Sequence, residues 1–278
     1  MCSWSRYGEE DQYFKNAVRP RAANWAHRAR GGRLGDWQQI ALVIAGGLAG
    51  GFVNGMTGFG TALTGLPFWL NAVDPALAAQ LGAACSIVGQ VSTLRAIWHA
   101  IDWWRLAPML IAGLIGVPIG TLFVPYLTIA TFKLAVGLIL VLYCGFMLLA
   151  AGRIRLRFGE QGAEAGVGFA GGIMAGVAGL SGVPPTIWAS LKGWPKERRR
   201  SVFQAFNLTI LTAMLVSSFA HGLIGHEFLV SAALALPAAL VGVWLGHRTY
   251  LWLDDRRFDR IVLVLLMLSG ISLIWFNH

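Results

Sequence analysis

Clustered glycines with small polar neighbours are the residues of this chain whose types and spacing could form a binding site. The stretch 46–70 reads GGLAGGFVNGMTGFGTALTGLPFWL, and seven of its first fifteen residues are glycine. The polar residues scattered through it are Asn54, Thr57, Thr61 and Thr64. Glycine permits φ > 0 and close approach of the backbone to another group. In a membrane, irregular backbone persists only where protein buries it or where it lines a polar cavity. We therefore expect a helix that breaks at residues 58–60 and faces a bound molecule there; close helix packing through small residues is the alternative.

A second copy of this pattern occurs later in the chain. Residues 171–182 read GGIMAGVAGLSG, which matches GGFVNGMTGFG at 50–60 with four glycine pairs at one offset of 121. Proline follows both copies. GVPIG at 116–120 also matches GVWLG at 242–246 at an offset of 126, and Phe132 matches Phe258 at the same offset. These ordered matches predict an internal duplication. Paired glycine- and proline-interrupted apolar segments are typical of a transporter's binding site.

The composition is that of a membrane protein. The 278 residues are 56% hydrophobic and 13% charged, and the mean hydropathy is +0.62. Soluble domains carry about 25% charged residues. The formal charge of +9 fits basic residues that flank membrane spans, and no base-stacking or basic-groove pattern indicates nucleic acid. The three cysteines have no paired or metal-ligand spacing, so we expect neither a metal nor a cofactor.

The apolar runs predict an all-α bundle of about eight membrane segments in a multi-pass cell (inner) membrane protein. We expect a polar basic tail at 1–37, a first four-segment repeat at 38–157 and a second at 158–278. The segments are 37–73, 77–98, 106–126, 132–151, 162–191, 202–220, 228–248 and 258–276. The first has some 35 residues, too many for one straight span of ~20, so it is broken or re-entrant.

The basic loops bear on orientation. Lys and Arg residues follow the fourth, fifth and seventh segments, whereas the loop after the sixth has none. If basic loops are cytoplasmic, the fifth segment must return to the side from which it enters, and the two halves are then inverted. The same reasoning puts the Arg-rich tail outside. Either the tail is an exception to the rule or the first segment crosses only once.

Anion binding is the chemistry that the two breaks favour. If a helix restarts after each break, its free N–H groups and the positive end of its dipole face the cavity. Two such ends could hold a small oxyanion without a buried Lys or Arg, and hydroxyls and amides would complete the shell. Sulfonate, sulfite, sulfate or carboxylate oxygens suit such a site. The candidate substrate-binding residues are Asn54, Thr57, Gly58, Phe59, Gly60, Thr61, Ser86, Gln90, Gly179, Leu180, Ser181, Gly182, Thr186, Gln204 and Asn207.

Other functions have weaker support. Residues 179–183 lack the final glycine of a nucleophile elbow and its strand–helix context, so we expect no catalytic residue. His99 with Asp102, and His221 with His226 and Glu227, follow matching segments; they could relay protons, or they are polar loop residues at the interface. A channel with a glycine-lined pore and a membrane enzyme that uses Cys85 or the histidines are the alternatives to a transporter.

The pattern resembles the TauE/SafE family of sulfite and organosulfur exporters. The resemblance rests on Gly58-Phe59-Gly60 with the later Leu66-Pro67, on the run G-x-x-x-G-x-x-G-L-S-G at 172–182 followed by proline, and on Ile101-Asp102-Trp103. It covers the chain from about residue 37 onward. This chain departs from the family in reading Gly60-Thr61-Ala62 where the family has further glycines. The resemblance implies transport of small sulfur-containing or carboxylate anions, coupled to protons.

Overall fold

The computed structural model describes residues 36–58, 60–94, 103–123, 127–149, 161–194 and 196–250, together with residues 267, 270, 271, 274 and 275. All regular secondary structure within these residues is helical. The nine helices are α2 (Asp36–Thr57), α3 (Thr61–Trp69), α4 (Pro75–Leu94), α5 (Trp103–Phe123), α6 (Ile129–Leu149), α7 (Gln161–Ala178), α8 (Val183–Leu191), α9 (Lys196–Ala220) and α10 (His226–Tyr250). Five of these helices, α2, α5, α6, α9 and α10, are long and apolar enough to cross a membrane. The predicted all-α class and the multi-segment membrane bundle are confirmed. The eighth predicted segment lies almost entirely outside the described residues.

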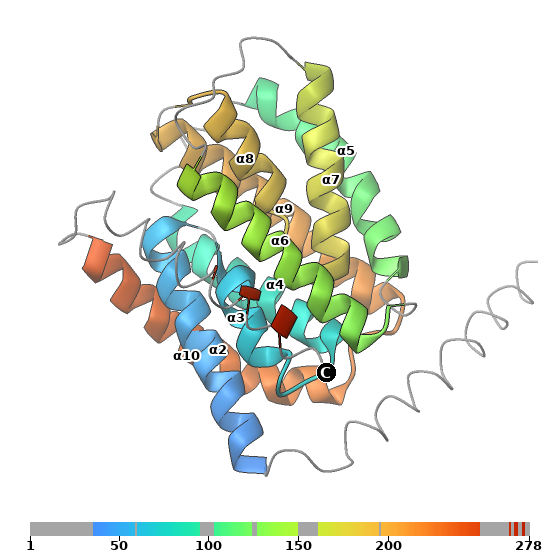
Figure 1. Ribbon diagram of the computed structural model, residues 1–278, viewed down its shortest axis with the longest axis vertical. Helices are drawn as coiled ribbons and strands as arrows, with labels where there is room; N and C mark the ends of the chain where they lie inside the picture. The colour runs from blue at the N-terminus through green and yellow to red at the C-terminus, as the bar shows by residue number, and fades with distance from the viewer. Residues whose placement is uncertain are drawn as a thin grey trace, which may run out of the picture.

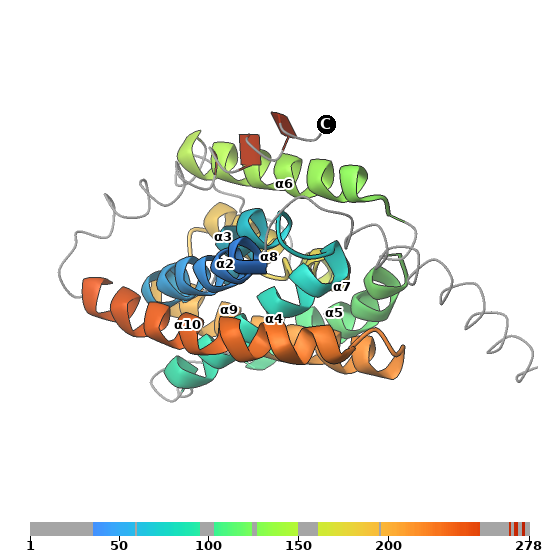
Figure 2. The same ribbon diagram turned by 90° about the horizontal axis from the view of Figure 1, so that it is seen from below.

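The helices form a bundle in which short helices occupy the centre. α6 runs across one face and α10 along the opposite face, with α2, α3 and α8 between them (Figure 2). α2 lies beside α10 at one end of the view, and α5 lies beside α7 at the other (Figure 1). The outer helices thereby enclose the two helix breaks.

The first break divides α2 from α3. Gly58 has φ of 81° and Gly60 has φ of 93°, the left-handed region that only glycine adopts at little cost. α3 then runs back along α2, as two contacts show. A Cβ on Gly50 would meet the Thr61 carbonyl oxygen at 2.7 Å, and the Trp69 Nε1–H donates to the Val43 carbonyl oxygen over 3.1 Å. The predicted break at residues 58–60 is confirmed, and the segment is a hairpin.

The second break divides α7 from α8 at the matching place. α7 ends at Ala178 and Gly179 has φ of 70°. The two breaks also end alike. The Thr64 hydroxyl donates to the Gly60 carbonyl oxygen, and the Thr186 hydroxyl donates to the Gly182 carbonyl oxygen, both over 2.6 Å. These two pairs are 122 residues apart in the sequence, so the two glycine-rich motifs have matching local structure at the breaks.

Three glycines of α2 and three of α7 allow close packing against long neighbouring helices. A Cβ on any of these six would meet a backbone carbonyl oxygen of the neighbouring helix. Gly47, Gly51 and Gly55 of α2 lie against Ala235, Ala239 and Val243 of α10, in that order; Gly168, Gly172 and Gly176 of α7 lie against Met109, Gly113 and Val117 of α5. The residue numbers rise together in each pair, so α2 is parallel to α10 and α7 to α5. The first helix of each half thus packs on the helix that forms the third segment of the other half. The helix breaks and the close packing are both present, at different glycines.

Polar contacts gather several helix ends at one end of the bundle. The Lys133 Nζ donates to the Asn71 Oδ1 over 3.4 Å, and the Gln80 Nε2 donates to the Leu223 carbonyl oxygen over 3.2 Å. Asp74 accepts from the Leu77 N–H over 3.0 Å and caps α4. Burial raises the pKa of the Asp74 carboxyl, against the effect of its backbone hydrogen bonds, and the nearby Glu227 raises it further. α3 and α9 therefore end where α4, α6 and α10 begin.

The glycine packing gives a stability prediction with a control on the same helix. Gly172→Ala places a methyl group against the Gly113 backbone, whereas a Cβ on Gly166 meets nothing within 4 Å. We expect Gly172→Ala to lower the free energy of unfolding by about 1–3 kcal/mol through overpacking. Gly166→Ala should leave it unchanged or raise it by about 0.5–1 kcal/mol through helix propensity. Thermal unfolding in detergent measures both; equal melting temperatures for the two variants would contradict the α5–α7 packing.

Candidate functional site

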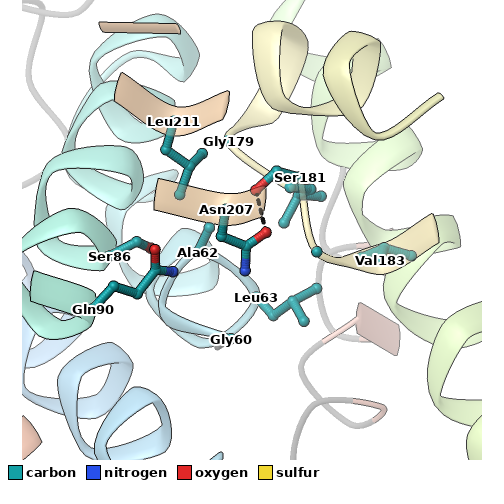
Figure 3. A pocket seen from close by; sticks show the side chains of 12 residues that line it. Gly60, Ala62, Leu63, Ser86, Gln90, Gly179, Ser181, Val183, Asn207 and Leu211 are labelled. Atoms are coloured by element: carbon teal, nitrogen blue, oxygen red, sulfur yellow. Dashed lines mark hydrogen bonds between the residues drawn. The ribbon is translucent and has the colours of Figure 1, made fainter. Parts of the chain in front are cut away.

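A small cavity lies between the two helix breaks. Both halves of the chain line it, as Figure 3 shows. The first half contributes Gly60, Ala62, Leu63, Ser86 and Gln90, and the second contributes Gly179, Leu180, Ser181, Gly182, Val183, Asn207 and Leu211. The breaks, which lie more than a hundred residues apart in the sequence, are brought to one place by the helices that enclose them.

The lining positions of the two halves correspond. Ser86 and Gln90 are four residues apart on α4 and share a helix face, and Asn207 and Leu211 have the same spacing on α9. Each α9 residue follows its α4 counterpart by 121 positions. Equivalent positions of the two halves therefore line the cavity, but the side chains at these positions differ chemically. The amide of Gln90 is matched by the aliphatic side chain of Leu211, and the hydroxyl of Ser86 by the amide of Asn207.

A buried hydrogen bond orients the Asn207 amide toward the cavity. The Ser181 hydroxyl donates to the Asn207 Oδ1 over 2.8 Å, so the Nδ2 group is directed into the space above Gly60 and Leu63 (Figure 3). The Asn207 side chain is only 3% exposed. A buried amide N–H stabilises the protein or a ligand only when it finds an acceptor. The Asn207 Nδ2 group can donate to an acceptor that occupies the cavity.

The backbone contributes more donors on one side than on the other. The first intrahelical bond of α3 joins the Thr64 N–H to the Gly60 carbonyl, so the N–H groups of the three residues between them are the orphan donors of a helix N-terminus. In α8 the corresponding bond joins Thr186 to Gly182, but two of the three intervening residues are Pro184 and Pro185, which have no N–H. The two breaks have similar backbones, but the second offers fewer backbone N–H donors than the first. The Asn207 Nδ2 group supplies a side-chain donor in the second half.

The cavity is electrically neutral and small. Its twelve lining residues include no lysine, arginine, histidine, aspartate or glutamate. The space open to the centre of a water molecule is about 20 Å³, which holds roughly one water. An oxyanion of four or more heavy atoms enters only if the lining helices separate. Its charge must then be stabilised by hydrogen bonds and helix dipoles alone.

The structure brings eight of the predicted site residues to the cavity lining. They are Gly60, Ser86, Gln90, Gly179, Leu180, Ser181, Gly182 and Asn207. Sequence reasoning missed the apolar lining residues Ala62, Leu63, Val183 and Leu211. The four-residue spacing from Asn207 to Leu211 was a signal that could have found the last of these.

The other predicted residues lie near the cavity or behind it. Asn54 is buried, and its Nδ2 donates to the Ser86 carbonyl oxygen over 3.4 Å. The Thr57 hydroxyl donates to the Val53 carbonyl oxygen over 2.9 Å and the Thr186 hydroxyl donates to Gly182, each within its own helical turn. Thr61 and Gln204 are fully buried outside the lining. Gly58 forms the break, and Phe59 lies outside the described residues.

Cys85 and His221, which the enzyme and proton-relay alternatives would use, do not line the cavity. Cys85 is fully buried in the apolar core. His221 is exposed, and its Nδ1 lies 2.7 Å from the Ser217 carbonyl oxygen. His99 and Asp102 lie outside the described residues. Within the part of the chain that the structure describes, no three His, Cys, Asp or Glu side chains are placed to hold a metal ion.

Comparison with known proteins agrees with the geometry. The family model described as "Sulfite exporter TauE/SafE" matches residues 42–273, which include both helix breaks and every residue of the cavity. The chain belongs to the TauE/SafE family. No curated protein and no solved structure matches it. As a TauE/SafE protein with several helices fit to cross a membrane, it is an integral multi-pass membrane protein of a sulfite exporter family.

The Ser181–Asn207 hydrogen bond gives a second stability prediction. Ser181→Ala leaves the buried Asn207 Oδ1 without its donor, so we expect the free energy of unfolding to fall by about 1–3 kcal/mol. Ser92→Ala is the control, because the Ser92 hydroxyl is exposed and donates to the Val88 carbonyl oxygen on its own helix; its effect should stay within about 0.5 kcal/mol. The cost of Ser181→Ala should also shrink in an Asn207→Ala background. Additive effects of the two substitutions would contradict the bond.

Proposed function

We propose that this TauE/SafE protein is a secondary transporter, an exporter in the cell (inner) membrane, for small sulfur-containing or carboxylate organic anions such as sulfite and sulfonates. The single observation that carries the proposal is the meeting of both helix breaks at a buried cavity that is lined by hydroxyl and amide groups and by no charged side chain. Broken helices that face each other near the middle of a bundle are the usual substrate site of secondary transporters. Membership of the sulfite exporter family supports the substrate class and the direction.

The small size of the cavity favours alternating access over a permanently open pore. Space for about one water does not give an anion a continuous path, so the helices around it must move for a substrate to enter and leave. Such movement at a fixed central site is how transporters with two repeats work. A glycine-lined channel is the alternative, and flux that does not saturate with increasing substrate concentration would indicate it.

We further propose that the two four-segment halves have inverted orientations. Support comes from the two hairpins. α3 returns the chain to the bundle end with Asn71 and Asp74, where α4 begins. α8 leads into α9, which reaches that same end only at its last residues, near Leu223. The second hairpin therefore opens to the opposite end, where Lys192 and the basic start of α9 indicate the cytoplasm. On this arrangement the Arg-rich tail, which precedes α2, is the exception to the charge rule.

The transport proposal is tested by placing valine at two glycines of the same backbone conformation. Gly179 has φ of 70° and Gly222 has φ of 66°, so valine strains both sites by about 1–3 kcal/mol. Only Gly179 lines the cavity. In proteoliposomes, we expect saturable sulfite flux for the wild type and for Gly222→Val, and at least a tenfold lower rate for Gly179→Val. Flux that is absent from the wild type, or equal in the two variants, would contradict the site.

The inverted arrangement is tested by labelling single cysteines in a background without Cys2, Cys85 and Cys144. Asn71→Cys and Gly225→Cys are exposed at one end of the bundle, and Lys192→Cys lies at the other. A membrane-impermeant maleimide added to intact cells should label the first two and spare the third, because basic loops are cytoplasmic. Labelling of Asn71→Cys and Gly225→Cys from opposite sides of the membrane would show that the halves are not inverted.

A further inference from the structure

The cavity offers an anion hydrogen bonds but no compensating charge. Its polar side chains are two hydroxyls, from Ser86 and Ser181, and two amides, from Gln90 and Asn207. All four residues are at most 4% exposed. The backbone adds the N–H groups at the start of α3, which precede the first intrahelical bond from the Thr64 N–H. Each of these groups is a dipole, and none of them carries a full positive charge.

This neutrality limits the charge of the ion that can bind. The free energy needed to remove an ion from water rises with the square of its charge, so a dianion costs roughly four times as much as a monoanion of the same size. Sites for doubly charged oxyanions commonly meet that cost with arginine or lysine. Four neutral side chains and one helix N-terminus do not provide it.

The same groups suit an oxyanion that still carries a proton. Hydroxyls and amides accept hydrogen bonds as well as donate them, whereas lysine and arginine only donate. The O–H of a singly protonated oxyanion can therefore donate to a hydroxyl or amide oxygen of the lining, while its bare oxygens accept from the N–H groups. A fully ionised dianion leaves those acceptor oxygens facing negative charge.

We propose that the site selects monoanions, so that sulfite is carried as hydrogen sulfite and its proton crosses the membrane on the substrate. The inference rests on the proposed transport function and specifies the charge state of the substrate at that same cavity. No titratable group of the lining is needed for such proton movement. A sulfonate with one acidic group, which carries a single charge at every assay pH, binds without a proton.

Titratable groups outside the cavity could also make transport depend on pH, so their effect must be separated from that of the substrate. Asp74, whose pKa is raised by burial, lies near Glu227 at the bundle end where α4 and α10 begin, and the exposed His226 precedes Glu227. Titration of these groups would change the transport of every substrate alike. Hydrogen sulfite, by contrast, loses its proton near neutral pH, so a pH effect confined to sulfite belongs to the substrate.

The test measures flux into proteoliposomes as a function of pH for three anions, with flux into protein-free liposomes subtracted. Labelled methanesulfonate has one charge throughout, sulfate has two, and sulfite changes from one to two. We expect methanesulfonate flux to be nearly constant with pH. Sulfite flux at constant total sulfite should fall about tenfold for each pH unit above its second ionisation, and sulfate should neither move nor compete.

The outcomes separate this inference from the proposed function. Sulfate flux comparable to that of methanesulfonate, or sulfite flux that rises with pH, overturns the monoanion selection and leaves anion transport standing. A parallel fall for methanesulfonate and sulfite assigns the pH dependence to the protein and also overturns the inference. If none of the three anions moves, the proposed transport of small anions fails as well.

A substituted cavity gives a second measurement. Gln90→Lys adds the missing positive charge, so sulfate should become a competitor of sulfite, with its apparent affinity raised at least tenfold. Gln90→Leu is the matched control, because it removes the amide without adding charge and should weaken methanesulfonate binding while sulfate stays excluded. Leu211→Lys, at the corresponding position of α9, serves if Gln90→Lys does not fold. Continued exclusion of sulfate by folded lysine variants would contradict charge as the basis of selection.

Discussion

Backbone hydrogen bonding in a medium without water is the constraint on which this structure depends. A helix that stops inside a membrane exposes N–H and C=O groups that lipid cannot satisfy. In this protein both stops are enclosed by other helices, and the enclosure is possible because glycines let the helix backbones touch. Gly51 of α2 against α10 and Gly172 of α7 against α5 occupy corresponding contacts. The glycines that allow close packing therefore let other helices enclose the backbone groups that the helix-breaking glycines expose.

The two helix breaks have similar backbones but different chemistry. The Thr64 and Thr186 hydroxyls make equal hydrogen bonds to the carbonyl oxygens of Gly60 and Gly182, yet the prolines of α8 remove donors that α3 retains. Asn207 stands where the first half has Ser86, and it is oriented by Ser181. A site built from two unequal halves can hold a substrate that has two unlike ends, such as a sulfonate head with an organic group. Apolar residues line both sides, Ala62 and Leu63 in the first half and Val183 and Leu211 in the second.

The sequence was informative where a residue type permits few structures. A glycine pair inside an apolar run predicted the break because few other residues tolerate φ near 80°, and Gly58, Gly60 and Gly179 have such values. The offsets of 121 and 126 predicted which helices correspond, and the α2–α10 and α5–α7 contacts follow the same offsets. The pattern could not say which way a polar side chain faces. Gln204 and Asn207 are three residues apart on α9 and both are buried, yet only Asn207 lines the cavity.

The neutral lining also bears on how a transporter completes its cycle. In the proposed alternating-access cycle, the site returns after release through states in which no substrate interacts with its lining. An unpaired lysine or arginine in the middle of the bundle would make those states costly, since an isolated buried charge is far more expensive than a neutral dipole. Neutral groups can instead bond with one another, as the Ser181 hydroxyl does with the Asn207 amide oxygen. Asn207 takes part in both states: its Nδ2 group would donate to the substrate, and its Oδ1 accepts from Ser181 when no substrate is bound. A neutral site therefore gives up affinity for dianions and in return lowers the barrier to the return step.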